Sequence, residues 1–246
     1  MRPTFLLLTA LLALPASADP PAGIKTAIEA PDRRDDAADD RRRHPAELLE
    51  FAQVKPGDIV VDLVPGAGYF TRLFSRIVGP TGHVYAIWPD EYARIDGGEV
   101  LLLESLAHDP HYPNITVLHQ PAAQLTFPVK ADLVWTSQNI HDYPDRFMGR
   151  IDLKALSQSI LQGLKPGGRF VVIDHVAQPG SGLRDAERFH RIDPELVKDQ
   201  ALAAGFAWDG ESDVLRNPAD SHTAVVFDPS IRGHTDQFVY RFKAPN

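Results

Sequence analysis

Polar and titratable side chains gather in residues 136–144, directly after a run of apolar residues typical of a buried strand. His141 ionises near neutral pH and can act as a general base, and the neighbouring Asp142 can orient its ring. Asn139 or Tyr143 can position a substrate. The alternative is that His141 and Asp142 cap the next helix and fix the loop. Both interpretations stay open, because loops at such an edge carry function more often than other loops do.

A second pair of titratable residues, Asp174 and His175, ends another predicted strand. This pair can face the same cleft, or it can serve only to anchor a loop. The ten histidines include no His-x-x-x-His or His-Glu-x-x-His spacing, so the sequence predicts no metal site. A metal bound by His141, Asp174, His175 and His190 is the alternative.

A glycine-containing bend at residues 62–69 joins a predicted strand to a predicted amphipathic helix. Gly66 and Gly68 allow the main chain to approach a ligand without a clash from Cβ atoms. The helix that follows offers N–H groups without partners inside the helix, and Asp62 places a carboxylate at the end of the strand. The bend therefore predicts a ligand site, and the alternative is that its glycines are only structural.

Runs of apolar residues alternate between buried strands and one-faced helices over most of the chain. This alternation predicts an α/β fold with a doubly wound parallel sheet, whose ligands bind at the carboxyl ends of the strands where the strand order reverses. The predicted strands are residues 59–63, 83–87, 115–118, 131–136, 170–173, 207–215 and 238–242. The predicted helices begin at Pro45 and then cover residues 70–78, 100–106, 153–164 and 194–204, with Asp193 as the N-cap of the last.

The first eighteen residues have the pattern of a secretory signal peptide. Arg2 precedes an apolar run over residues 5–14, and residues 16–18 form a small-residue cleavage pattern. The apolar run is too short to span a bilayer as a helix, and the alternative is an uncleaved anchor. We expect cleavage after residue 18, a periplasmic or secreted location, a polar arm over residues 19–44 and a single domain over residues 45–246.

Composition limits the partners that the chain can have. Hydrophobic residues make up 43% and charged residues 24%, as in globular domains. The net charge of −8 disfavours nucleic acid, and the absence of cysteine excludes disulfides, zinc–thiolate sites and cysteine nucleophiles. We expect a small-molecule substrate and no transmembrane span after signal cleavage, and the oligomeric state stays open.

Three groups of arginines each have two interpretations. Residues 41–43 can grip an anion or belong to a solvated helix with paired charges. Arg191 can bind a carboxylate or phosphate, but a capping or salt-bridge role is favoured. Arg216 and Arg232 can be anion contacts in a lid or substrate wall that includes residues 215–229, or that segment is an ordered surface excursion.

The chain resembles the class I S-adenosylmethionine-dependent methyltransferases over residues 45–210. Three stretches carry the resemblance: the acid and spaced glycines of residues 60–68, the turn into a strand at residues 79–86, and the Lys-Pro-Gly-Gly turn within residues 164–170. The whole chain is similar to a group of exported "predicted methyltransferases". That group shares the Pro-Gly-x-Gly-Tyr-Phe-Thr-Arg loop and an ending like residues 231–238.

The resemblance implies a Rossmann-like, seven-stranded, mostly parallel sheet with one antiparallel strand and helices on both faces. It also implies S-adenosylmethionine as the cofactor of methyl transfer to a small-molecule or envelope acceptor. Chemistry in this family takes place just after the fourth strand, which gives His141 and Asp142 the catalytic role. The residues implied to bind the cofactor are Asp62, Pro65, Gly66, Ala67, Gly68, Tyr69, Trp88 and Asn139.

Three positions depart from the family's pattern. Val64 stands where the first glycine of the loop is usual, Trp88 where an acid accepts the ribose hydroxyls, and Pro121 near the place of an acid that holds the adenine amino group. Asp90 or Glu91 can reach back to replace the first acid, or Trp88 can stack on the adenine. The alternative function is a non-catalytic ligand-binding protein on a degenerate methyltransferase fold. A dinucleotide-dependent oxidoreductase is disfavoured, because the loop lacks Gly-x-Gly-x-x-Gly spacing and no acid ends the second strand.

Overall fold

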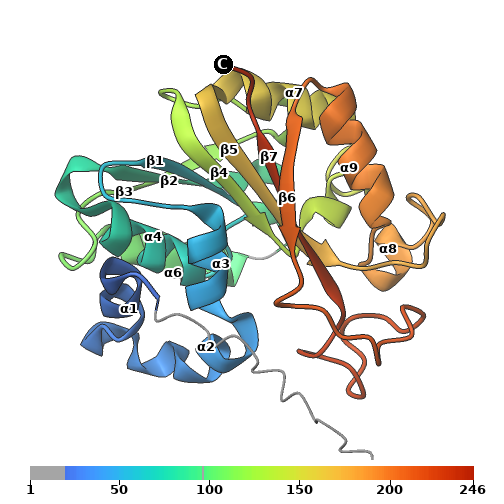
Figure 1. Ribbon diagram of the computed structural model, residues 1–246, viewed down its shortest axis with the longest axis horizontal. Helices are drawn as coiled ribbons and strands as arrows, with labels where there is room; N and C mark the ends of the chain where they lie inside the picture. The colour runs from blue at the N-terminus through green and yellow to red at the C-terminus, as the bar shows by residue number, and fades with distance from the viewer. Residues whose placement is uncertain (1–19, 96) are drawn as a thin grey trace, which may run out of the picture.

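The computed structural model describes residues 20–95 and 97–246 (Figure 1), so the expected signal peptide lies outside the described residues. Within them, seven strands form one sheet in the order β3-β2-β1-β4-β5-β7-β6. β7 is antiparallel to its neighbours β5 and β6, and the other neighbouring pairs are parallel. The prediction of a doubly wound, mostly parallel sheet with one antiparallel strand is confirmed. The strands are β1 Ile59–Leu63, β2 His83–Pro89, β3 Ile115–Gln120, β4 Ala131–Ser137, β5 Leu164–His175, β6 Ala207–Ser212 and β7 Gln237–Lys243.

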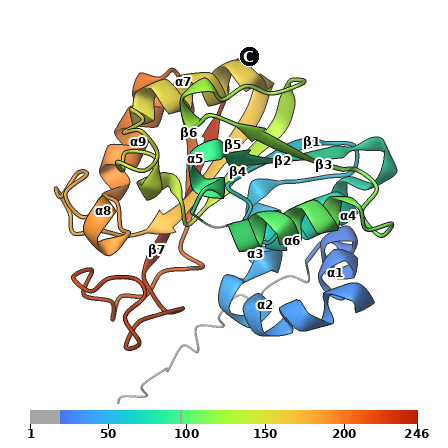
Figure 2. The same cartoon turned by 180° about the vertical axis from the view of Figure 1, so that it is seen from behind.

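Helices cover both faces of this sheet, with α3, α4 and α6 on one face and α7 and α9 on the other (Figures 1 and 2). The α-helices are α1 Ala22–Ile28, α2 Ala37–Arg43, α3 Pro45–Ala52, α4 Tyr69–Val78, α5 Asp90–Ala93, α6 Gly97–Ala107, α7 Leu153–Gly163, α8 Ala186–Phe189 and α9 Pro194–Ala203. The short 3-10 helices are η1 Pro31–Asp36, η2 Gly79–Thr81, η3 Ala122–Gln124 and η4 Ile140–Asp142. In the part of the chain that the structure describes, no helix has both the length and the apolar character that crossing a membrane requires.

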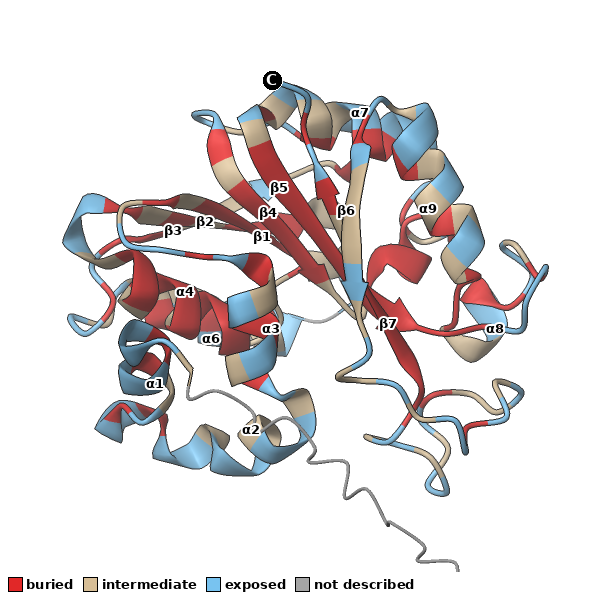
Figure 3. Ribbon diagram, in the orientation of Figure 1, coloured by how far each residue is buried: buried red, intermediate tan, exposed pale blue. Residues whose placement is uncertain are grey.

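The central strands are buried on both sides (Figure 3), which explains why their sequences are continuous apolar runs rather than alternating ones. The α4 helix packs its apolar stripe on these strands. The ring centroids of Phe70 and Phe74 lie 4.7 and 5.4 Å from that of Trp135 in β4. Well-packed aromatic pairs of this kind hold α4 against the sheet. The loop between β1 and α4 is therefore fixed at both ends.

The structure differs from the sequence prediction at the start of β5. The Lys-Pro-Gly-Gly stretch, predicted as a turn, belongs to β5, where the pairing with β4 shifts register. Gly167 has a left-handed φ of +71°, and its N–H donates to the carbonyl of Ala244 near the chain's end. Pairing with the residues that follow β7 thus extends the strand through the predicted turn. The predicted strand over residues 207–215 ends earlier, at Ser212, whereas Asp193 caps α9 as predicted.

The N-terminal arm folds into α1, η1 and α2, which lie on the same side of the molecule as α4 (Figure 1). Charged side chains tie it to α4. The Asp36 carboxylate lies 2.8 Å from the guanidinium of Arg72, and the Tyr69 hydroxyl donates to Asp40 at 2.6 Å. The arm is therefore attached beside the glycine loop, at the first turns of α4.

Candidate functional site

A cavity of about 630 Å³ lies at the carboxyl ends of the strands, where the strand order reverses between β1 and β4. Doubly wound sheets bind ligands at this point, and the volume falls within the range of small-molecule sites. The lining comes from the ends of β1, β2, β4 and β5, from the N-terminal arm, from α6 and from the segment between β6 and β7, which we call the C-terminal segment. The predicted site residues that line the cavity are Asp62, Pro65, Gly66, Ala67, Tyr69, Trp88, Asn139, His141 and Asp142.

The two glycines of the loop after β1 have different roles. Both have left-handed backbone, with φ of +59° at Gly66 and +83° at Gly68. A Cβ at Gly68 would lie 2.6 Å from Cδ2 of Leu106, so this glycine allows α6 to pack on the loop, and it does not line the cavity. The nearest atoms to a Cβ at Gly66 belong to the Glu99 carboxylate, at 3.3 Å, and both residues line the cavity. Gly66 is therefore the glycine that keeps main chain open to a ligand.

Three other cavity residues, Val64, Gln138 and His190, hold left-handed backbone without being glycine, with φ of +51°, +65° and +53°. Such a conformation costs about 1–3 kcal/mol and is found preferentially at functional sites. The Val64 N–H donates to the Ile87 carbonyl at 3.0 Å, and the Asn139 amide donates to the Val64 carbonyl at 2.9 Å. The valine at the usual first glycine position therefore has a backbone conformation that glycine readily adopts.

The end of β2 presents an indole in place of a carboxylate. Trp88 is fully buried, and its ring centroid lies 5.4 Å from that of Tyr92. Its buried Nε1 has no hydrogen-bond partner within the described residues. Glu91 accepts a hydrogen bond from the backbone of η3 at 2.9 Å and does not line the cavity, and Pro121 does not line it either. The carboxylate that reaches the cavity on this side is that of Glu99 in α6.

Asp62 lies at the end of β1 with only 3% of its surface exposed. The Thr71 hydroxyl donates to its carboxylate at 2.7 Å. Burial raises the pKa of Asp62 to about 7, and the hydrogen bond from Thr71 and the charge of Arg43 limit the increase. This carboxyl group therefore titrates near neutral pH rather than in the acidic range of an ordinary aspartate.

His141 is held by a carboxylate of β5. Its Nδ1 lies 2.8 Å from Oδ1 of Asp174, and its backbone N–H donates to the other oxygen at 2.9 Å. Asp142 lies 3.3 Å from Nε2. Asp174 thus has the orienting role that the sequence suggested for Asp142. Burial alone lowers the pKa of His141, but Asp174 and Asp142 outweigh burial and raise it to about 9, so the free site holds His141 protonated at neutral pH.

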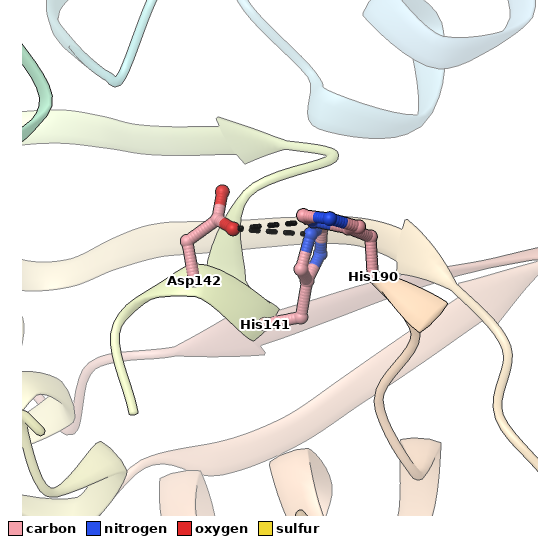
Figure 4. A group of neighbouring side chains, drawn as sticks. All are labelled: His141, Asp142 and His190. Carbon is pink, nitrogen blue, oxygen red and sulfur yellow. Dashed lines mark ion pairs between the residues drawn. The ribbon is translucent and has the colours of Figure 1, made fainter. Parts of the chain in front are cut away.

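Two further histidines border the same part of the cavity. His175 is buried, its Nδ1 lies 2.7 Å from the Thr235 hydroxyl, and burial lowers its pKa to about 3. His190, at the end of α8, has Nδ1 3.8 Å from the Asp142 carboxylate. One nitrogen or oxygen atom from each of His141, Asp142 and His190 lies within 4.8 Å of the others, so these three can hold a metal ion (Figure 4).

The C-terminal segment between β6 and β7 forms a wall of the cavity, to which it contributes Phe227 and Arg232. Arg216 instead forms an ion pair with Asp236 inside the segment, with 2.8 Å between Nε and Oδ1. Arg191 is fully buried with its guanidinium 2.8 Å from Asp220, so the salt-bridge interpretation of this arginine is confirmed. This ion pair fastens the wall to the residues that follow β5.

The N-terminal arm also contributes to the cavity, through Asp36, Asp39 and Arg43. The guanidinium of Arg43 lies over the ring of Tyr69, 4.7 Å from its centroid. Arg42 forms an exposed ion pair with Asp39. The interpretation of residues 41–43 as a solvated helix with paired charges therefore fits Arg42 but not Arg43. Sequence reasoning missed the acidic residues of the arm, because blocks of mixed charge are typical of solvated segments.

Comparisons with known proteins agree with this architecture. No family model matches the chain. The chain is 30% identical over 193 residues to the ubiquinone/menaquinone biosynthesis C-methyltransferase UbiE of Vibrio vulnificus (strain YJ016). The match covers 77% of this chain and 63% of that relative, so the chain spans less than two thirds of the relative's length.

Solved structures share the fold at low sequence identity. A SAM-dependent methyltransferase from Aquifex aeolicus matches with a TM-score of 0.60 and 16% identity, over 87% of this chain and 96% of that one. The [4+2]-cyclase SpnF matches with a TM-score of 0.60 and 18% identity, over 83% of this chain and 80% of that one. These likenesses establish the fold.

Proposed function

We propose that this chain is a member of the class I S-adenosylmethionine-dependent methyltransferase superfamily, binds S-adenosylmethionine beside residues 65–69 and transfers its methyl group to a small-molecule or envelope acceptor. The observation that carries the proposal is the open main chain at Gly66 in a cavity that continues to His141 and Asp142. A ligand on the glycine loop and an acceptor beside the loop after β4 would thus share one cavity.

The residues of the cavity fit this cofactor, partly by other means than the family's usual pattern. Main chain at Gly66 would lie against the nucleoside, and Trp88 would supply an apolar wall. Glu99 would supply the carboxylate for the ribose hydroxyls that the end of β2 lacks. Asp62 and Asn139 would hold the charged methionine end.

When bound, S-adenosylmethionine supplies a methyl group that its sulfonium charge already activates. The chain then has to align an acceptor, exclude water and manage a proton. His141 and Asp142 line the cavity where the acceptor would lie, and Asp174 fixes the orientation of the His141 ring. Phe227, in the C-terminal wall, lines the same cavity with its ring centroid 4.9 Å from that of His190, and would limit the entry of water.

Calorimetry and product analysis test the proposal together. Titration with S-adenosylmethionine is expected to give saturable binding. Incubation of the protein with the cofactor and an envelope extract is expected to release S-adenosylhomocysteine, detected by mass spectrometry, with heat-inactivated protein as the control. The absence of both binding heat and a thermal shift at millimolar cofactor would contradict the proposal.

Trp88 and Pro121, in place of two family acids, favour a second candidate function, namely ligand binding without turnover. The shared fold does not decide between the two functions, since a neighbour of equal TM-score is a [4+2]-cyclase. Saturable cofactor binding without any S-adenosylhomocysteine release in envelope extracts would support this alternative. Detection of a methylated product would exclude it.

The affinity for S-adenosylmethionine is expected to fall as the pH is lowered below about 7, by about tenfold per pH unit. Below the Asp62 pKa the free chain holds this carboxyl protonated, whereas a cationic ligand favours its ionised form. Calorimetry over a pH series measures the slope. Asp62→Asn is expected to bind more weakly at pH 8 and to lose the slope, and an equal slope in this variant would contradict the assignment.

We also propose that the mature chain acts outside the cytoplasm, as the signal-peptide pattern of residues 1–18 supports. The chain recovered from the envelope or medium is expected to begin at Asp19 by N-terminal sequencing. Recovery of an uncleaved chain from the cytoplasm alone would contradict this location.

A further inference from the structure

The cavity contains a cluster of metal-ligating side chains from two separate elements. Asp142 Oδ1 lies 3.3 Å from Nε2 of His141 in η4 and 3.8 Å from Nδ1 of His190 at the end of α8. Figure 4 shows both rings turning a nitrogen toward this carboxylate. Ligand atoms about 2.1 Å from one ion are separated by roughly 3–3.5 Å. The two pairs that Asp142 forms are close to this spacing, and the three ligand atoms all lie within 4.8 Å of one another.

Outer partners orient two of these three groups. The Nδ1 side of His141 is bound to Asp174, which is fully buried, and the Tyr92 hydroxyl donates to Oδ2 of Asp142 at 3.2 Å. These bonds leave Nε2 of His141 and Oδ1 of Asp142 as the facing atoms. A carboxylate behind a ligating histidine is the usual support of a metal site, because it fixes the ring and raises its basicity.

The charge of this region also favours a cation. Asp142, Asp145 and Asp174 are all at least 95% buried. Among the residues that the structure describes, no lysine or arginine forms an ion pair with any of the three, and the ion pairs of Asp142 and Asp174 are with histidines. Buried carboxylates are stable when they are paired or bind a metal.

We propose that His141, Asp142 and His190 form a site for a divalent transition-metal ion, whose remaining coordination positions bind a hydroxyl oxygen of the methyl acceptor. Two imidazoles and a carboxylate suit zinc, manganese, iron or cobalt, whereas calcium and magnesium prefer oxygen ligands alone. Because all three residues line the cavity, the positions that the protein leaves open face the space where the acceptor would lie. This proposal departs from the sequence-based expectation of no metal.

The assignment of the acceptor rests on the proposed methyl transfer. A divalent cation lowers the pKa of a coordinated hydroxyl, which then releases its proton to water. The oxygen forms a bond to the methyl carbon while the carbon–sulfur bond breaks and its electron pair remains on sulfur. The products are a methyl ether and S-adenosylhomocysteine, so the acceptor class is a hydroxylated small molecule.

Cobalt(II) binding to the tag-free full chain, stripped with a chelator, tests the site by calorimetry and visible absorption. One equivalent is expected to bind with the absorption bands of a nitrogen- and oxygen-ligated ion. His190→Ala is expected to weaken the Kd by about 100-fold, and Asp174→Asn, a positioning variant, by about 10–100-fold. His119→Gln, which alters a histidine–carboxylate pair with 3.2 Å between its atoms outside the cavity, is the matched control and is expected to bind as the unaltered chain does.

The outcomes separate the metal site from the proposed function. Absence of cobalt binding at millimolar concentration, or equal affinity in His190→Ala with an unchanged unfolding temperature, would overturn the metal site. S-adenosylmethionine is titrated into the chelator-treated chain in parallel. Cofactor binding without metal binding removes this inference alone, whereas metal binding without cofactor binding removes the methyl transfer and the acceptor assignment and leaves the metal site standing.

Discussion

Replacing Gly66 with valine is expected to weaken the Kd for S-adenosylmethionine by at least ~100-fold, which corresponds to about 2.8 kcal/mol. The added side chain would enter the cavity at the point where bare main chain now faces it, beside the Glu99 carboxylate. It would occupy the space that the nucleoside needs, while the sheet and α4 remain packed. Calorimetric titration measures the loss, and circular dichroism confirms that the chain is folded.

Gly180→Val is the matched control for backbone strain. Gly180 has a left-handed φ of +74°, close to the +59° of Gly66, but a Cβ there would meet no atom within 4 Å, and it does not line the cavity. Both variants force a β-branched residue into the same strained backbone region. The control is expected to lose stability without losing affinity. Equal affinities in the two variants would show that the glycine loop does not contact the cofactor.

Arg191→Met is expected to lower the free energy of unfolding by about 3–5 kcal/mol, because it leaves a buried carboxylate without its cation. Arg191 donates to the carbonyls of Ala224 at 2.8 Å and Val176 at 3.0 Å, and pairs with Asp220 at 2.8 Å. The side chains of both charged residues are at most 1% exposed. Methionine preserves much of the volume, so the loss reports the charge and the hydrogen bonds. Urea unfolding followed by fluorescence measures it.

Arg146→Met serves as the comparison for an exposed pair. Arg146 lies 3.8 Å from Glu187, and 73% of its side-chain surface is exposed. Exposed ion pairs contribute little, so a change below about 0.5 kcal/mol is expected. A loss below about 1 kcal/mol in Arg191→Met would contradict the view that this ion pair fastens the C-terminal wall of the cavity.

Local patterns were sufficient for much of the fold and for the position of the candidate cavity. The strand of residues 59–63 and the stripe of α4 are visible because burial on both faces or on one face leaves a periodic apolar signal. The bend between them falls at the reversal of strand order, which the alternation of elements already implies. Asp62 and Gly66 therefore line the cavity as expected.

Contacts between distant segments were not predictable in the same way. The sequence suggests that Asp174 acts as a pair with its neighbour His175. In the structure the Asp174 carboxylate is instead hydrogen-bonded to His141, in a loop 33 residues earlier. His190 reaches the same place from the end of a short helix. Nothing in the local sequence indicates these partners, because they are determined by the register of β4 beside β5 and by the path of the chain after β5.

The start of β5 and the N-terminal arm show two further limits. Gly167 signals a turn locally, but pairing with the end of the chain incorporates it into a strand. The charge blocks of the arm are typical of a solvated segment, but Asp36 and Asp40 find partners on α4. In both cases the deciding partner lies more than 25 residues away in the sequence.

A crystal structure of the chain grown with saturating S-adenosylhomocysteine would show directly whether the nucleoside binds beside the glycine loop. Ligand density is expected in the cavity lined by Asp62, Gly66 and Trp88, in contact with the main chain of residues 65–69. A saturated crystal in which this cavity holds no nucleoside, or in which the ligand binds elsewhere on the chain, would contradict it.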